Sequence, residues 1–191
     1  MSLISMTVTD LLDAFASSAP TPGGGSAAAL AGAMGASLLK MVAAMPKTRT
    51  GTPEERTALD AAAAELETLR QQLARLVDED TKAYDLVTGA FKLPKGTDEE
   101  KAARSKAIQA AMKAATEAPL QTMRACAAVL GHARTVAAHG NQNASSDIEV
   151  GTALARAGLF GGDKNVEINL GSLKDEAYCN TVAEECARLR R

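Results

Sequence analysis

The chain has 191 residues, of which 46% are apolar and only 3% aromatic. This length favours a single domain over residues 1–191, and the apolar share is sufficient for a hydrophobic core. The formal net charge is −2 and no basic stripe stands out, so we expect no nucleic acid and no anionic membrane as partners. The start of the chain lacks a signal-peptide pattern, and the longest apolar run, residues 27–39, is too short for a membrane span. We therefore expect a cytoplasmic protein.

Two helices are predicted in the first quarter of the chain. Thr7 with Asp10 resembles a capping box and opens a short helix. The segment 19–26 is rich in Pro and Gly and is expected to be non-helical, with Ser26 as the N-cap of the next helix. That helix, residues 27–44, is apolar nearly all round and built of small residues. It should be the central helix and allow its neighbours to approach closely.

Two long helical regions are predicted in the middle of the chain. Residues 52–55 combine a Thr N-cap, Pro at the first helical position and Glu at the third, and they start a helix that ends at residues 93–96. A capping box at residues 97–100 starts the next helix. Pro119 should kink or break this helix, and residues 120–138 should form a further one.

The last quarter is also predicted to be helical. A polar turn at residues 141–147 leads into a helix that Gly161 and Gly162 should interrupt, and residues 173–191 form a last amphipathic helix. Strand signals are nearly absent. The predicted fold is all-α, a multi-helix bundle with a central Ala/Gly-rich helix and long antiparallel helices. The helix faces indicate a large apolar surface shared between subunits of a homodimer.

The three cysteines and two histidines are expected to play no catalytic role. The cysteines fit no zinc motif and give no disulfide framework, so we interpret them as buried thiols. His132 and His139 are isolated, without the spacing of metal ligands. No metal site is therefore expected.

Asp80 is the candidate catalytic residue because it interrupts an apolar stripe. A carboxylate on a buried helix face is either paired or keeps a raised pKa. A raised pKa is what a general acid or base near neutral pH needs. The structural alternative is that Asp80 caps a neighbouring helix or pairs with a buried Arg. The stripe follows steps of three and four residues through Leu66, Leu69, Leu73, Leu76, Ala83, Val87 and Ala90.

Two further groups of residues are candidates for ligand binding. The turn Gly23–Ser26 places backbone amides at a helix start, where they can bind an anion or a carbonyl oxygen, although no P-loop motif follows. Asn165 and Asn169 share one helix face in an apolar segment, and amides suit a ligand edge that alternates donors and acceptors, such as a pterin ring. The alternatives are a flexible turn for the glycines and inter-helix bonding for the Asn pair. Asn141 is a further candidate amide, for which helix capping is an equal alternative to ligand binding.

These residues also resemble a known family. Residues 20–28 are similar to the N-terminal signature of the formiminotetrahydrofolate cyclodeaminase and methenyltetrahydrofolate cyclohydrolase family. Residues 78–84, 93–104 and 140–170 are similar to three more of its blocks, in the same order. The resemblance covers nearly the whole chain.

The resemblance implies an enzyme that acts on a reduced folate. It implies an all-helical subunit in an intimate homodimer, a tetrahydrofolate derivative as substrate, and neither a bound cofactor nor a metal. The first expectation is a cyclodeaminase of histidine degradation, which closes formiminotetrahydrofolate to methenyltetrahydrofolate and releases ammonia. The alternative within the family is a cyclohydrolase, which hydrolyses methenyltetrahydrofolate to formyltetrahydrofolate. An alternative of another class is a non-catalytic helical interaction module.

The resemblance also implies a set of site residues. One block departs from the family: members often carry a Gly-Lys pair and a Tyr shortly after the Ala-rich helix, where this chain has Met45–Arg49. Lys47 and Arg49 are expected to bind the glutamate tail of folate. The glycine-rich turn, the helix Asp and the Asn/Asp block of the family fall on Gly23, Gly24, Gly25, Ser26, Asp80, Asn141, Asp147, Asn165 and Asn169.

Overall fold

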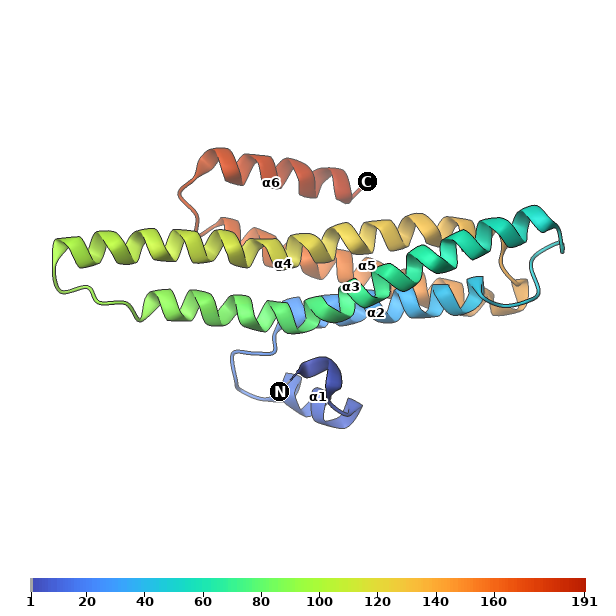
Figure 1. The fold of residues 1–191 in the computed structure, drawn as a ribbon, viewed down its shortest axis with the longest axis horizontal. Helices are drawn as coiled ribbons and strands as arrows, with labels where there is room; N and C mark the ends of the chain where they lie inside the picture. Colours follow the sequence, from blue (N-terminus) through green and yellow to red (C-terminus); the bar gives the residue numbers. More distant parts are fainter. Residues whose placement is uncertain (1) are drawn as a thin grey trace.

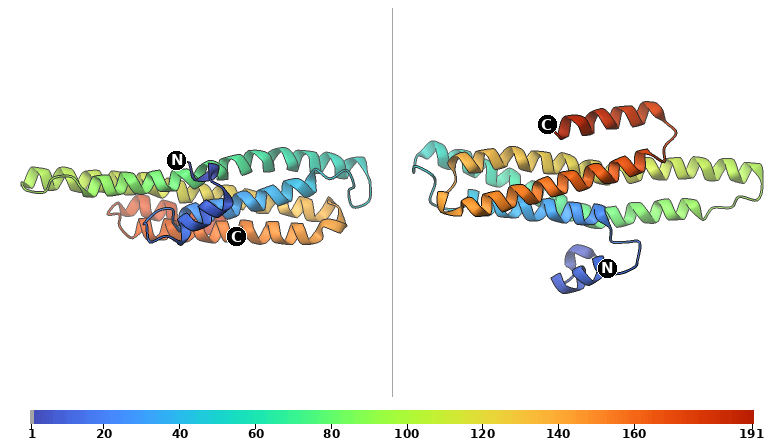
Figure 2. Two further views of the ribbon diagram at one scale, coloured as in Figure 1. Left: turned by 90° about the horizontal axis from the view of Figure 1, so that it is seen from below. Right: turned by 180° about the vertical axis from the view of Figure 1, so that it is seen from behind.

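The computed structural model describes residues 2–191, in which helices are joined by loops and no strand occurs. Figures 1 and 2 show the long helices α2 to α5 side by side in one elongated bundle, with α1 and α6 lying outside it. The prediction of an all-α bundle is confirmed. The elements are η1 (Leu3–Ser5), α1 (Val8–Ala16), α2 (Gly24–Ala43), α3 (Pro53–Phe91), α4 (Asp98–His139), η2 (Gln142–Ala144), α5 (Ser145–Leu170) and α6 (Glu176–Leu189).

The central helix is α2, as its small residues predicted, and it forms an antiparallel pair with α5. The two backbones approach closely: a methyl group added at Gly158 would lie 2.8 Å from the carbonyl oxygen of Ala28 and 3.0 Å from the nitrogen of Gly32. Only glycine leaves room for this contact. Position by position, the pairs along the contact are Gly35 with Gly151, Gly32 with Gly158, Ala28 with Gly161, and Gly24 with Asn165.

Three of the four helix starts predicted from capping residues are confirmed. Thr7, Thr52 and Thr97 each accept a hydrogen bond from the backbone N–H three residues further on, the last in a complete capping box. The fourth prediction is wrong, because α2 begins at Gly24 and Ser26 is its third residue. The Ser26 side chain instead bonds to α3.

Two predicted helix breaks do not occur, whereas a kink at Pro119, the alternative to a break there, stays a prediction. Helix α4 continues through Pro119, and α5 continues through Gly161 and Gly162. Packing explains the glycines, since a methyl group added at Gly162 would lie 2.9 Å from Cγ of Met123 and 3.0 Å from the carbonyl oxygen of Pro119. These glycines let α5 lie close to α2 and α4, and their low helix propensity is outweighed by tertiary contacts.

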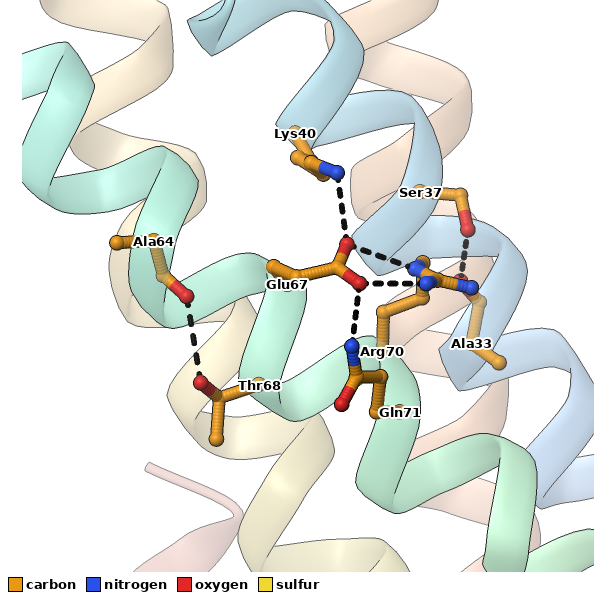
Figure 3. A network of polar contacts seen from close by, with 8 residues as sticks. All are labelled: Ala33, Ser37, Lys40, Ala64, Glu67, Thr68, Arg70 and Gln71. Atoms are coloured by element: carbon orange, nitrogen blue, oxygen red, sulfur yellow. Dashed lines mark hydrogen bonds and ion pairs between the residues drawn. The ribbon is translucent and has the colours of Figure 1, made fainter.

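A polar network joins α2 to α3 halfway along the bundle (Figure 3). The Glu67 carboxylate accepts hydrogen bonds from Arg70 (2.6 and 3.0 Å), from Gln71 (2.6 Å) and from Lys40 on α2 (2.7 Å). Arg70 and Lys40 hold the pKa of Glu67 well below its usual range. Because both cations are partly exposed, the network orients α3 against α2 more than it adds stability.

Helix α2 is long and apolar enough to cross a membrane by length and composition alone, so the length argument from residues 27–39 was wrong. More than half of its most apolar window, 56%, is buried inside the bundle. The helix therefore has the burial of a core helix, packed against α3, α4 and α5.

Several side chains outside the site are accounted for by packing. Cys126 and Cys186 are buried thiols, as predicted, while Cys179 is half-buried. Burial raises the pKa of the Cys126 thiol to about 12, which leaves it unreactive. Asp78 accepts hydrogen bonds from the Ser2 hydroxyl (2.6 Å) and the Leu3 N–H (2.5 Å) and so ties η1 to α3.

Candidate active site

A cavity of about 330 Å³ opens where the N-terminus of α2 meets α3, α4 and the C-terminal part of α5. We call it the Asp80 cavity. Asp80 and Tyr84, both on α3, are the titratable side chains in its wall. The complete wall comprises Pro20, Thr21, Gly23, Gly24, Gly25, Asp80, Ala83, Tyr84, Val87, Met112, Ala115, Asn165, Ile168 and Asn169.

The Asp80 carboxylate lies against the first turn of α2. Its Oδ2 accepts a hydrogen bond from the backbone N–H of Ser26 (2.9 Å) and lies 3.1 Å from the Ser26 hydroxyl. Burial raises the pKa of Asp80 above its usual range, and the two bonds from Ser26 bring it part of the way back. Asp80 thus caps a neighbouring helix and also has the raised pKa of an acid–base group. The capping alternative offered by the sequence is confirmed, and the raised pKa is what an acid–base role needs, but the catalytic role of Asp80 stays a prediction.

The Ser26 hydroxyl fits both protonation states of Asp80. Ser26 is fully buried, and its Oγ lies 2.8 Å from the carbonyl oxygen of Val77 as well as 3.1 Å from Asp80. A hydroxyl has one proton and two acceptor lone pairs. When Asp80 is ionised, Ser26 can donate to it; when Asp80 is protonated, Asp80 can donate to Ser26, which donates to Val77. Ser26 therefore stays hydrogen-bonded while Asp80 gains and loses a proton.

Gly25 is required by the position of Asp80. A Cβ atom at Gly25 would overlap Oδ1 of Asp80, whereas one at Gly24 would meet only Nδ2 of Asn165, at 3.5 Å. The N–H groups of Gly24 and Gly25 form no hydrogen bond within residues 2–191. They lie at the positive end of the α2 dipole and can donate to an oxygen of a ligand. The prediction that this turn supplies free backbone donors stands on this geometry.

Asn165 and Asn169 face the cavity from α5. Their amide nitrogens are held by backbone carbonyls, Asn165 by Gly161 (2.8 Å) and Asn169 by Ala115 (3.1 Å). The bond from Asn169 is the inter-helix contact foreseen as an alternative to ligand binding. Because both bonds use the amide nitrogens, the side-chain oxygens of Asn165 and Asn169 are available as acceptors in the cavity wall.

Sequence reasoning missed Tyr84 and the apolar part of the wall. Tyr84 lies one turn after Asp80, so the four-residue spacing alone was a usable signal. Met112 on α4 and Ile168 on α5 supply apolar surface on either side. Nothing in their local sequence distinguishes them from ordinary core positions.

Four predicted site residues lie at the other end of the bundle. Arg49 donates its backbone N–H to His139 (2.8 Å), and the Asn141 side chain accepts from the N–H of Asn143 (3.0 Å). Helix α2 separates this loop from Gly24 by about 30 Å at 1.5 Å per residue. Within one subunit, Lys47 and Arg49 therefore lie outside the Asp80 cavity, and their binding of the glutamate tail stays a prediction. Asn141 and Asp147 likewise lie outside the Asp80 cavity of the same subunit, and capping of η2 explains Asn141.

The Asp80 cavity is suited to proton transfer. It combines one carboxylate of raised pKa, two free backbone donors and two amide oxygens beside apolar walls. Residues 2–191 contain no cluster of three or more His, Cys, Asp or Glu side chains arranged to hold a metal ion. The side chains of the Asp80 cavity can bind a flat polar molecule and move a proton at one point.

Comparisons with known proteins connect this cavity to a family. The family model described as formiminotransferase-cyclodeaminase matches residues 7–188. The methenyltetrahydrofolate cyclohydrolase of Methylorubrum extorquens is 44% identical over 94% of this chain and 86% of its own length. The formimidoyltransferase-cyclodeaminase of Gallus gallus is 32% identical over 88% of this chain but only 31% of its own length. The solved structure of formiminotetrahydrofolate cyclodeaminase from Thermotoga maritima matches with a TM-score of 0.86 and 26% identity, over 97% of this chain and 89% of that chain.

The fold and the cavity define an all-helical enzyme with a partly buried carboxylate beside the N-terminus of its central helix. The chain belongs to the formiminotransferase-cyclodeaminase family, as the resemblance of its sequence blocks implied. Two of those blocks, residues 20–28 and 78–84, meet in the Asp80 cavity, and a third contributes Asn165 and Asn169.

Proposed function

We propose that this protein hydrolyses methenyltetrahydrofolate to formyltetrahydrofolate, with Asp80 as the general base and then the general acid. The observation that carries the proposal is the Asp80 carboxylate, which combines a raised pKa with a position beside two unpaired helix N–H groups. The hydrolysis is proposed ahead of the cyclodeamination expected from the sequence, and its support is the relative in Methylorubrum extorquens, which is named a cyclohydrolase and is covered over 86% of its length. No bound cofactor or metal enters the proposed reaction.

The first step is addition of water to the methenyl carbon. The substrate carries a positive charge shared by the two nitrogens that flank this carbon. Ionised Asp80 takes a proton from the water while the water oxygen bonds to the methenyl carbon, which becomes tetrahedral. Ser26 then donates to Val77 and accepts the new proton of Asp80, so the added proton has a hydrogen-bond partner.

The second step is collapse of the tetrahedral carbon. One carbon–nitrogen bond breaks, protonated Asp80 returns its proton to the departing nitrogen, and the hydroxyl on the carbon loses its proton to water as the formyl C=O forms. The sum is one water consumed and one proton released. The N–H groups of Gly24 and Gly25 are placed to stabilise charge that develops on oxygen. Asn165 and Asn169 offer acceptors for N–H groups of the pterin ring.

Cyclodeamination of formiminotetrahydrofolate is the second candidate. It is favoured by the structural match to the Thermotoga maritima protein of that name, which extends over 97% of this chain. The reaction passes through a tetrahedral carbon of the same kind, formed when a folate nitrogen attacks the formimino carbon. Asp80 would protonate the leaving ammonia. Both activities therefore need the same acid–base group.

The test is an absorbance assay for methenyltetrahydrofolate, run in both directions with purified protein. We expect accelerated loss of the methenyl chromophore over the spontaneous rate and no ammonia release from formiminotetrahydrofolate. Appearance of the chromophore with ammonia would establish the cyclodeaminase in its place. Absence of both reactions would overturn the proposed function.

A further inference from the structure

A cavity of about 550 Å³ lies between α4 and α5 at the point where α6 ends. Figure 1 shows that α6 lies along α4 and ends partway, so that α4 and α5 continue beyond it without this cover. The cavity is lined by residues from three segments, which lie within 127–137 of α4, within 152–159 of α5 and within 189–191 at the end of α6. We call it the arginine groove. It shares no lining residue with the Asp80 cavity.

The inner wall of the arginine groove is apolar and built mainly of small residues. On α4 it consists of alanine and leucine side chains, namely Ala127, Leu130, Ala133 and Ala137. Leu159 of α5 and Leu189 of α6 add apolar surface from the other two walls. Gly131 also lines the groove, and a Cβ atom added there would meet no heavy atom within 4 Å. The groove can therefore take an apolar group without a shift of the backbone.

The rim of the arginine groove is positively charged. Four arginines line the groove and no Asp or Glu does. Arg190 is neutralised, since one of its guanidinium nitrogens lies 2.8 and 2.9 Å from the two carboxylate oxygens of Asp163. Arg134 of α4 and Arg156 of α5 form neither an ion pair nor a side-chain hydrogen bond with any of residues 2–191. Two guanidinium groups are thus available to an anion.

Arg134 and Arg156 lie on facing helices within reach of one another. A Cβ atom at Gly158 would lie 2.7 Å from Sγ of Cys126, so these two positions are opposite each other in the antiparallel pair of α4 and α5. Eight residues further along α4, Arg134 lies opposite position 150, which is six residues from Arg156. This offset is about 9 Å along the axis at 1.5 Å per residue. Because an extended arginine side chain spans much of that distance, both guanidinium groups can contact one anionic group between them.

Carboxylates outside the groove leave this positive charge in place. Glu185 of α6 is held by Arg124, at distances of 2.6 and 2.9 Å. Glu149 is exposed on α5 and lies seven residues before Arg156, about 10 Å along the helix axis. At that separation, solvent and salt screen its charge at the groove.

We propose that the arginine groove is a binding site for a small organic anion, a molecule with an apolar body and a carboxylate or phosphate group. The apolar body lies against the alanine and leucine surface, and Arg134 and Arg156 bind the anionic group. A planar guanidinium matches both carboxylate and phosphate oxygens. The cavity has the volume of a small-molecule pocket, and three segments of the chain enclose it. The proposal is independent of the proposed reaction, because the groove and the Asp80 cavity are separate.

The test is calorimetric titration of the protein with phenyl phosphate, inorganic phosphate and phenol. Phenyl phosphate has both parts of the proposed ligand, and each of the other two probes has one. We expect phenyl phosphate to bind at least about tenfold more tightly than either, because only it buries a ring and pairs with both arginines. Benzoate in place of phenyl phosphate shows which anionic group is preferred. No binding of phenyl phosphate or benzoate to the wild type would overturn the proposal.

Arg134→Gln/Arg156→Gln should weaken the binding of phenyl phosphate at least about tenfold, because both charges that hold the phosphate are lost. The matched control is Arg75→Gln/Arg188→Gln, which removes two exposed arginines that form no ion pair within residues 2–191 and do not line the groove. The control should bind as the wild type does. Equal affinity in both double variants would place the anion elsewhere, such as at the free N–H groups of α2, and would overturn the proposal.

Gly131→Leu tests the apolar wall. The leucine side chain fills the space beside Gly131, so the binding of phenyl phosphate should weaken at least about tenfold while that of inorganic phosphate stays within about twofold of wild type. Gly89→Leu is the control, because Gly89 in α3 is equally open and lies outside the groove. Circular dichroism checks that both variants remain helical. Unchanged binding of phenyl phosphate to Gly131→Leu would contradict the proposed position of the apolar body.

Discussion

At the scale of single residues, Asp80 has a dual role. It supplies the acceptor that caps α2 through Ser26, and it keeps an ionisable group in a partly buried cavity. Gly25 completes the arrangement, because any larger residue would displace the carboxylate. The structural and the chemical roles of Asp80 can be separated by substitution, since an Asn oxygen still accepts a hydrogen bond but cannot take up a proton.

Asp80→Asn should lower turnover by about a hundred- to ten-thousand-fold with the fold intact, because general acid–base catalysis is lost. The variant should also be more stable than wild type at neutral pH. Because the pKa of Asp80 is higher in the folded chain than in the unfolded chain, ionisation of Asp80 lowers the stability of the fold. This cost is complete once the pH has risen through the folded pKa, and it is absent below the unfolded pKa of about 3.9. The gain in stability should therefore disappear as the pH falls to about 4.

The measurements are steady-state rates at neutral pH and urea unfolding between about pH 4 and pH 8. Asp85→Asn is the control, since Asp85 is exposed on the same helix and does not line the Asp80 cavity. Full activity in Asp80→Asn would rule out the acid–base role.

At the scale of the elements, glycine has two opposite effects in these helices. Gly158 in α5 lies against α2, whereas a methyl group at Gly131 in α4 would meet nothing within 4 Å. The first glycine is required for packing, and the second only weakens its own helix. The sequence shows both as glycines inside a helix, and only the contacts distinguish them.

Gly158→Ala should lower the free energy of unfolding by about 1–3 kcal/mol, because the backbones of α2 and α5 would be pushed apart. Gly131→Ala should raise it by about 0.5–1 kcal/mol, because alanine loses less conformational entropy in a helix. Denaturant midpoints of the two variants measure both effects. Equal shifts of the same sign would contradict the packing role of Gly158.

At the scale of the whole molecule, one face of the bundle is apolar and uncovered. On α2, the residues that point away from the other helices recur at spacings of three and four and carry no charge. Met34 is one of them and is 50% exposed. On α5, Val150 is 51% and Ile168 is 71% exposed. Exposed apolar side chains along two packed helices are typical of a surface between subunits. We propose that a second copy of the chain covers this face.

Light scattering at micromolar concentration should give twice the mass of one chain. Met34→Asp should produce the monomer, because a charge would be buried without a partner in the interface. Leu86→Asp, which changes an exposed apolar residue on α3, should remain a dimer. A monomeric wild type would contradict the proposed dimer.

The sequence by itself determined the helical fold and identified Asp80 as a carboxylate on a buried helix face. The caps at Thr7, Thr52 and Thr97 and the apolar stripe of α3 are local patterns, and local hydrogen bonds and helix periodicity act in the same way wherever the helix lies. The interrupted stripe identified Asp80 because burial of a carboxylate always has a cost.

Only the tertiary structure decided which predicted residues share a site. Asp80, Gly25, Asn165 and Asn169 meet because α2 and α5 run antiparallel, and the same arrangement leaves Arg49 and its neighbours at the far end of α2. It also decided that α5 continues through Gly161 and Gly162. These outcomes depend on contacts between residues far apart in the chain, which a local pattern does not contain. The physical reason is that packing free energy outweighs the intrinsic preference of a single residue.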